Sequence, residues 1–141
     1  ETKKKVGEEQ CNNYRRSWDI SPPPMKEDDE NHLLFSPLNA NIPLGMIPFT
    51  ESLKNTYERV IPYYQKEIQK HIKENKNILI SAHGNSLRAL CKYIFKISDE
   101  KINKLEIPTG NPLMIEFDND LKINKYYYLD KTRAKTIIFN Q

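Results

Sequence analysis

The residues from Asn77 to Arg88 constrain the fold more than any other stretch, because they combine a strand pattern with a helix pattern. Ile78 to Ala82 is apolar and partly β-branched, and it has the length of a buried strand. The apolar residues that follow recur at helical spacing, and they are Leu87, Leu90, Cys91, Ile94 and Phe95. We therefore predict a strand that passes directly into a helix, with His83 at the junction.

This junction has the features of an anion-binding site. In open α/β sheets, ligands collect at the carboxyl ends of strands, and the free N–H groups of a helix N-terminus attract an anion. Gly84 lets the backbone approach a ligand closely, and Asn85 or Ser86 can cap the helix. An isolated histidine at a strand end is often only a satisfied polar group of the core. The helix start beside His83 favours a functional role, with a phosphate group as the expected ligand.

The composition indicates a folded globular protein. A length of 141 residues fits one domain, and 38% hydrophobic with 29% charged residues argues against disorder. The net charge of +3 does not by itself indicate a nucleic-acid partner. No apolar run has the length of a membrane span, and Glu1 to Gly7 does not resemble a signal peptide. Cys11 and Cys91 form no metal-ligand spacing, so we expect a cytoplasmic protein without a metal site.

The rest of the chain follows the pattern of a doubly wound α/β fold. We predict a helix up to Arg16, an extended connection through the three prolines at 22–24, and a long loop from Met25 to Phe49. Thr50 is the expected N-cap of a helix with an apolar stripe up to Ile72, which Pro62 should kink. Ser98 begins a short helix, and 113–117 with 122–129 should form a hairpin.

Several charged residues have two interpretations. Arg15 and Arg16 are either solvated or held by the rigid Trp-Asp-x-x-Pro-Pro-Pro connection for bidentate contact with phosphate or carboxylate. The helix after the junction should carry its cations on the polar, solvent-facing side; they are Arg88, Lys92 and Lys96. The other two histidines, His32 and His71, are expected at the surface.

Five motifs in consistent order resemble cofactor-dependent phosphoglycerate mutases. They are Tyr14-Arg15-Arg16-Ser17-Trp18-Asp19 with the prolines after it, Glu51-Ser52-Leu53-Lys54, the run from Ile78 to Arg88, Ile107-Pro108-Thr109-Gly110 and Tyr127-Tyr128-Leu129. The resemblance covers nearly the whole chain except 25–49 and the tail. It implies a three-layer α/β/α sandwich of the histidine-phosphatase type, with residues 1–141 as one partial domain that is incomplete at its N-terminus.

The resemblance also implies a reaction and a role for each matching residue. Members of the family interconvert 3-phosphoglycerate and 2-phosphoglycerate in glycolysis and gluconeogenesis through a phosphohistidine, which 2,3-bisphosphoglycerate primes without a metal. His83 would be the second active-site histidine, which stabilises the phosphoryl group in transfer. Gly84 and Asn85 would contact the ligand, and Arg15 and Arg16 would clamp its phosphate or carboxylate. The full-length protein would be a homo-oligomer that acts on small phosphoglycerates, without nucleic-acid or membrane partners.

The sequence departs from the family in what it lacks. The nucleophilic histidine of an Arg-His-Gly motif and the family's acidic proton donor are not in this sequence. The start at Glu1 agrees with a chain that begins partway through the fold, so we expect residues 1–141 alone to be inactive. Two other functions stay open: a non-catalytic fragment or partner subunit that binds phosphorylated metabolites, and a broad histidine-type phosphomonoester phosphatase.

Overall fold

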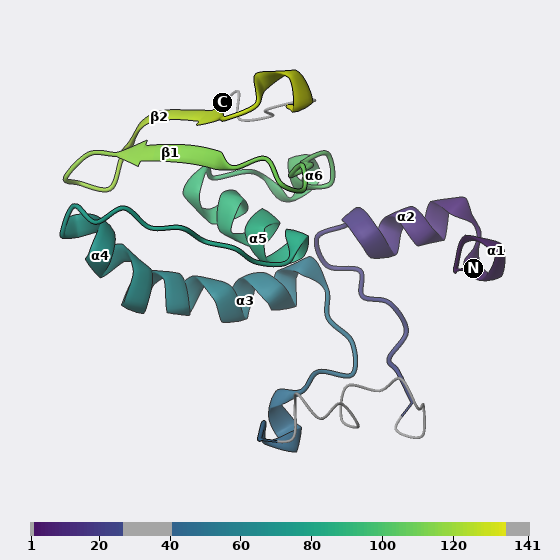
Figure 1. Ribbon diagram of the computed structural model, residues 1–141. Helices are drawn as coiled ribbons and strands as arrows, with labels where there is room; N and C mark the ends of the chain where they lie inside the picture. The colour runs from purple at the N-terminus through teal and green to yellow at the C-terminus, as the bar shows by residue number, and fades with distance from the viewer. Residues whose placement is uncertain (1, 27–40, 135–141) are drawn as a thin grey trace.

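The computed structural model describes residues 2–26 and 41–134 (Figure 1). Its elements in chain order are α1 (Thr2–Val6), α2 (Glu8–Arg16), the 3-10 helix η3 (Leu44–Met46), α3 (Leu53–Tyr63), the π-helix η4 (Tyr64–Ile68), α4 (Gln69–Lys73), α5 (Gly84–Ile94), α6 (Asp99–Ile102), β1 (Leu113–Phe117), β2 (Ile123–Tyr128) and the 3-10 helix η5 (Lys131–Arg133). The segment predicted as one helix up to Arg16 is two helices, α1 and α2, which Gly7 separates with a positive φ of 83°. The non-helical proline connection, the short helix after Ser98 and the hairpin are confirmed. Most of the loop predicted at 25–49, His32 and the end of the tail lie outside the described residues.

Helix α5 is the central element, and it lies between α3 and the β1–β2 hairpin (Figure 1). Its apolar face forms the larger core cluster with residues of neighbouring elements, which comprises Leu53, Ala89, Cys91, Phe95, Ile97, Ile102 and Leu105. On another side of the helix, Leu90 packs with Ile61 and Tyr64. Burial raises the pKa of the Cys91 thiol to about 12, as expected for a small core residue. The helix predicted after the junction is therefore confirmed.

Two predicted helix caps are wrong. Helix α3 begins after Ser52 and not after Thr50, because the Ser52 Oγ accepts from the Asn55 N–H at 3.2 Å while the Asn55 Oδ1 accepts from the Ser52 N–H at 3.1 Å. Helix α5 is capped by the His83 side chain, whose Nδ1 accepts from the Asn85 N–H at 3.3 Å, and not by the side chain of Asn85 or Ser86. Several residues near each helix start can cap it, and tertiary packing selects among them.

Pro62 lies within α3 without ending the helix. The π-helical turn η4 follows and leads directly into α4. A proline removes one i to i−4 hydrogen bond and crowds the preceding turn, so a local change of helix type is one way to accommodate it. The kink at Pro62 stays a prediction, and the structure shows a wider helical turn just after this residue.

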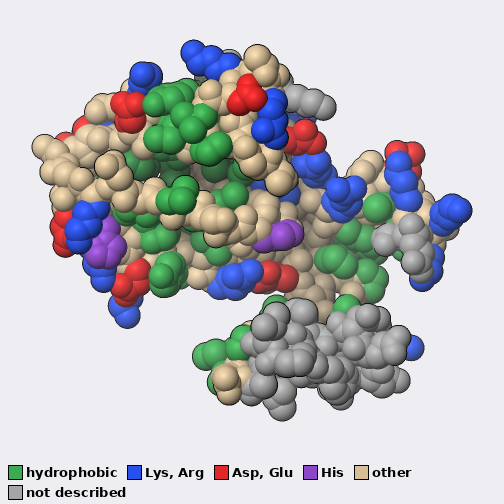
Figure 2. Space-filling view, in the orientation of Figure 1, with side chains coloured by type: hydrophobic (Ala, Val, Ile, Leu, Met, Phe, Trp, Pro, Cys, Tyr) green, Lys and Arg blue, Asp and Glu red, His purple; other side chains and the backbone are tan. Residues whose placement is uncertain are grey.

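The segment Ile78–Ala82 is not the buried strand that its composition predicts. It is neither helix nor strand, and Ile78, Leu79 and Ile80 are 39%, 88% and 37% exposed. Figure 2 shows hydrophobic side chains at the surface of the molecule, in the region of the hairpin. A strand is defined by pairing with a neighbour, and among the described residues the sheet consists of β1 and β2 alone. The α/β character is therefore present, while the described residues do not form a three-layer sandwich.

The hairpin covers one side of the core. Strands β1 and β2 pair antiparallel, with an irregularity in register after Glu116. Tyr128 is only 2% exposed, and the Tyr126 ring meets the Phe95 ring of α5's C-cap edge-on, with centroids 5.0 Å apart. Tyr126 and Tyr128 therefore pack the hairpin against the core.

The contrast between the core and the exposed segment can be measured with two leucines. Leu105 is 1% exposed, so Leu105→Ala should lower the free energy of unfolding by about 2–5 kcal/mol through lost burial and a cavity. Leu79 is 88% exposed, so Leu79→Ala should change it by no more than about 0.5 kcal/mol. Urea denaturation followed by circular dichroism measures both, and equal losses would contradict the assigned burial.

The cap at His83 can be separated from its chemistry. His83→Ala removes the acceptor for the Asn85 N–H and should destabilise the protein by about 1 kcal/mol. Asparagine is a preferred N-cap, so His83→Asn should recover most of that loss while lacking an imidazole. The same denaturation experiment tests this, and a His83→Asn variant no more stable than His83→Ala would argue against the cap.

Candidate functional site

One cavity of about 850 Å³ opens beside the N-terminus of α5. Its lining residues come from the ends of α2 and β2, the start of α5, the turn after α6 and η5; they are Tyr14, Arg15, Arg16, His83, Gly84, Asn85, Arg88, Glu106, Ile107, Pro108, Tyr128, Thr132 and Arg133. All five site residues named from the sequence are among them. The structure therefore brings together residues that lie about seventy positions apart in the chain.

The end of α2 is anchored where the sequence predicted a rigid connection. The Ser17 N–H and Oγ both donate to the Asn13 carbonyl, which terminates the helix. The Trp18 carbonyl accepts from the Lys54 N–H at 2.8 Å, and the Trp18 ring packs edge-on against Tyr57 at 5.4 Å between centroids. These contacts fix the backbone immediately after Arg16.

Arg15 and Arg16 differ in what holds their side chains. The Arg16 Nη2 donates to the Glu106 Oε1 at 2.6 Å, which forms an ion pair, and its Nη1 lies 3.5 Å from the Leu105 carbonyl oxygen. Arg15 is exposed, and its guanidinium has no hydrogen-bond partner within the described ranges. Arg15 is therefore available to a ligand, whereas a ligand anion must share Arg16 with Glu106.

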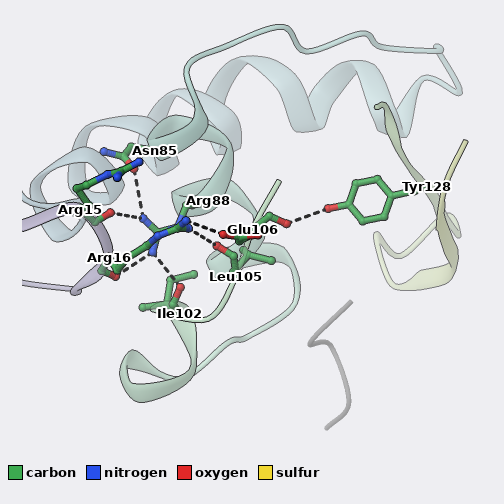
Figure 3. A network of polar contacts seen from close by, with 8 residues as sticks. All are labelled: Arg15, Arg16, Asn85, Arg88, Ile102, Leu105, Glu106 and Tyr128. Atoms are coloured by element: carbon green, nitrogen blue, oxygen red, sulfur yellow. Dashed lines mark hydrogen bonds and ion pairs between the residues drawn. The ribbon is translucent and has the colours of Figure 1, made fainter. Parts of the chain in front are cut away.

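The prediction that Arg88 lies on the solvent-facing side of its helix is wrong. Arg88 is 5% exposed, and its guanidinium donates to the carbonyls of Arg15, Arg16 and Ile102 at 3.3, 2.9 and 2.9 Å (Figure 3). It also donates to the Asn85 Oδ1 at 3.3 Å. Burial, with a smaller contribution from the charge of Arg16, lowers the pKa of Arg88 to about 10, so the group remains charged at neutral pH.

Lys92 is buried as well, one helical turn beyond Arg88. Its Nζ donates to the Ile97 carbonyl at 2.6 Å, pairs with the Asp99 Oδ1 at 2.6 Å and lies 4.5 Å from the centre of the Trp18 ring. The last contact is a cation–π interaction that ties the connection after α2 to α5. Helical periodicity predicted a solvent-exposed position for Lys92, and of the three cations only Lys96 is exposed.

Apart from Arg88, sequence reasoning did not select five polar lining residues: Tyr14, Glu106, Tyr128, Thr132 and Arg133. The Arg133 Nη2 donates to the Thr109 carbonyl at 2.6 Å, which holds η5 against the turn at Gly110. Burial raises the pKa of the Tyr128 hydroxyl to about 12, and that hydroxyl lies 3.5 Å from the Glu106 carbonyl oxygen. Tyr128 lies within the resemblance motif Tyr127-Tyr128-Leu129, and Glu106 directly precedes Ile107-Pro108-Thr109-Gly110. These motifs were the sequence signal that could have identified the two residues.

The charges around the cavity favour an anion. Four arginines and one glutamate line it, and His83 is exposed at the N-terminus of α5. Positive groups and free N–H groups at a helix start together suit phosphate or carboxylate. In the part of the chain that the structure describes, no group of His, Cys, Asp and Glu has the arrangement to hold a metal ion. A helix able to cross a membrane is likewise not found there.

The chain is similar to known proteins over most of its length. Residues 24–128 match the family model described as histidine phosphatase superfamily (branch 1). A protein of Pelagibacter ubique is 51% identical over 98% of this chain, one of Xylella fastidiosa (strain 9a5c) is 48% identical over 100%, and one of Borreliella burgdorferi (strain ZS7) is 46% identical over 96%. Each of the three is named 2,3-bisphosphoglycerate-dependent phosphoglycerate mutase.

The matches extend over only part of those relatives. The chain spans 58% of the Pelagibacter ubique and Xylella fastidiosa proteins and 55% of the Borreliella burgdorferi protein. The family model, by contrast, covers most of the chain itself. This chain therefore belongs to the histidine phosphatase superfamily (branch 1).

Proposed function

We propose that this chain carries one half of the phosphoryl-transfer site of a 2,3-bisphosphoglycerate-dependent phosphoglycerate mutase. The observation that carries the proposal is the convergence of Arg15, Arg16, His83, Gly84 and Asn85 on one cavity rich in arginine. Phosphoryl transfer depends mainly on positioned positive charge and oriented N–H groups. The names of the relatives support the reaction, which interconverts 3-phosphoglycerate and 2-phosphoglycerate.

Each residue has a role that its surroundings support. The exposed fork of Arg15 binds the phosphate or carboxylate of the ligand, and Arg16 binds it while paired to Glu106. The His83 Nδ1 accepts from the Asn85 N–H, so the neutral imidazole carries its proton on Nε2. That Nε2–H donates to the phosphoryl oxygens and stabilises the charge that they carry in transfer.

The cavity suits the cofactor named for the relatives. Its volume of about 850 Å³ and the guanidinium groups of Arg15 and Arg16 at its wall fit a small molecule with two phosphates and a carboxylate. Arg15, Arg16, Gly84 and Asn85 would hold 2,3-bisphosphoglycerate, which supplies the phosphoryl group that primes the reaction. The chain's own contribution is to bind and orient that anion at the start of α5.

The phospho-accepting histidine and the completing strands are proposed to come from the part of the relatives' length that this chain does not span. The sequence has three histidines, none within an Arg-His-Gly motif. Ile78–Ala82 is apolar, exposed and unpaired among the described residues, which supports a role as a strand of a larger sheet. In that arrangement the molecule becomes a three-layer α/β/α sandwich with His83 at a strand end.

Anion binding can be tested with this chain alone. Arg15→Gln should weaken inorganic phosphate binding roughly tenfold or more, because a charge-assisted hydrogen bond contributes about 1.5–3 kcal/mol. Arg59→Gln is the matched control, because Arg59 is an exposed arginine that pairs with Glu51 and does not line the cavity. Isothermal titration calorimetry at low salt measures both, and an Arg15→Gln affinity equal to that of Arg59→Gln would contradict the role of Arg15.

Turnover is expected only when the chain is completed. Co-expression with the part of the Pelagibacter ubique relative that this chain does not span should give mutase activity, which His83→Asn abolishes although it retains the cap. Amides of Ile78–Ala82 should then exchange with deuterium more slowly, because they pair in a sheet. Binding without turnover would favour the non-catalytic module, and release of inorganic phosphate without 2-phosphoglycerate would favour a phosphatase.

A further inference from the structure

We infer that Arg88 is the positioning residue of the anion site: it holds the end of α2 against α5 and thereby sets the guanidinium groups of Arg15 and Arg16 at the cavity. The inference rests on the proposed anion site and adds to it a residue that does not bind the ligand itself. Arg88 is buried, whereas Arg15 is exposed and Arg16 is partly exposed. The three arginines therefore divide into one that supports and two that reach the ligand.

Arg88 caps the C-terminus of α2 from another helix. The last carbonyls of an α-helix have no partner within the helix and carry its partial negative charge. The Arg15 and Arg16 carbonyls are of this kind, and Arg88 donates to them through Nη1 at 3.3 Å and Nη2 at 2.9 Å. No other donor to these two carbonyls is found among the described residues. One guanidinium thus binds both carbonyls of the backbone from which the two clamp side chains project.

The same guanidinium also orients Asn85 and the end of α6. Its Nη1 donates to the Asn85 Oδ1 at 3.3 Å, which leaves the Asn85 amide NH₂ free to donate to an anion. Its Nη2 donates to the Ile102 carbonyl at 2.9 Å, in the last residue of α6. Figure 3 shows these contacts radiating from Arg88 toward Arg15, Arg16, Asn85 and Ile102. One side chain therefore sets the positions of three proposed ligand contacts.

The terminal nitrogens of Arg88 are committed to the protein. Each hydrogen-bonds to two protein oxygens, and the remaining donor, Nε–H, is buried without a partner in the described part of the chain. A phosphate that bound the terminal nitrogens of Arg88 would have to break these bonds. A planar fork is required to serve four acceptors at once, and a lysine ammonium with three donors on one nitrogen lacks that geometry.

The first test compares Arg88→Lys with Arg59→Lys in phosphate titrations. Arg88→Lys keeps the charge and loses the fork, so affinity should fall roughly tenfold or more, whereas Arg59→Lys should leave it unchanged. Circular dichroism of each variant checks that the fold is retained. Affinity for Arg88→Lys equal to that of the parent overturns the inference, because charge alone would then suffice. A parent chain that binds no phosphate overturns the anion site itself and the inference with it.

A double-mutant cycle separates positioning from general destabilisation. If Arg88 acts through Arg15, Arg15→Gln should have a much smaller effect on affinity in the Arg88→Lys background than in the parent. If the fold-losses in phosphate affinity of the two single variants simply multiply in the double variant, the two residues act independently and the inference is overturned.

A measurement on the parent does not depend on a stable variant. During phosphate titration, the Nε–H signals of Arg15 and Arg16 in ¹⁵N NMR spectra should shift strongly, while that of Arg88 stays nearly constant. A shift of the Arg88 signal as large as theirs would make it a direct ligand and overturn the inference.

Discussion

The burial of one positive charge, that of Arg88, determines how the parts of this structure meet. Removing a guanidinium from water is costly unless its donors find partners. Arg88 finds neutral oxygens: the carbonyls at the ends of α2 and α6, and one side-chain amide. Helix C-termini carry partial negative charge, so two helix ends converge on this cation. The path of the chain between α2 and α6 is constrained by that requirement.

Helix α5 links this cation to both the core and the cavity. Its apolar side supplies Ala89, Cys91 and Phe95 to the main cluster, while its first residues meet the cavity. Lys92, one turn later, is a second buried cation, and its ammonium contacts the Trp18 ring in the connection after α2. Arg88 and Lys92 lie on α5, and His83 is its N-cap. The same helix therefore positions both the end of α2 and the proposed phosphate contacts.

The exposed apolar segment before His83 is the second feature on which the proposed arrangement depends. Leu79 is 88% exposed in a run with the composition of a buried strand. The chain belongs to the histidine phosphatase superfamily and spans 58% of the length of the Pelagibacter ubique relative. We propose that strands from the remaining length pair with this run. Pairing with further strands would remove apolar surface from water and fix the backbone that presents His83.

The sequence by itself determined the elements whose signals are local. The periodicity of α5, the apolar stripe of α3 and the hairpin were predicted, because helices and turns depend on neighbours a few positions away. Five of the residues that line the cavity were also named from the sequence, from the strand-to-helix junction and the family resemblance. Tertiary structure alone decided that Ser52 and His83 cap their helices, that Arg88 and Lys92 are buried, and that Ile78–Ala82 pairs with no strand among the described residues. These outcomes depend on contacts between distant segments: a helical period tells which side a residue occupies, but only packing decides what covers that side.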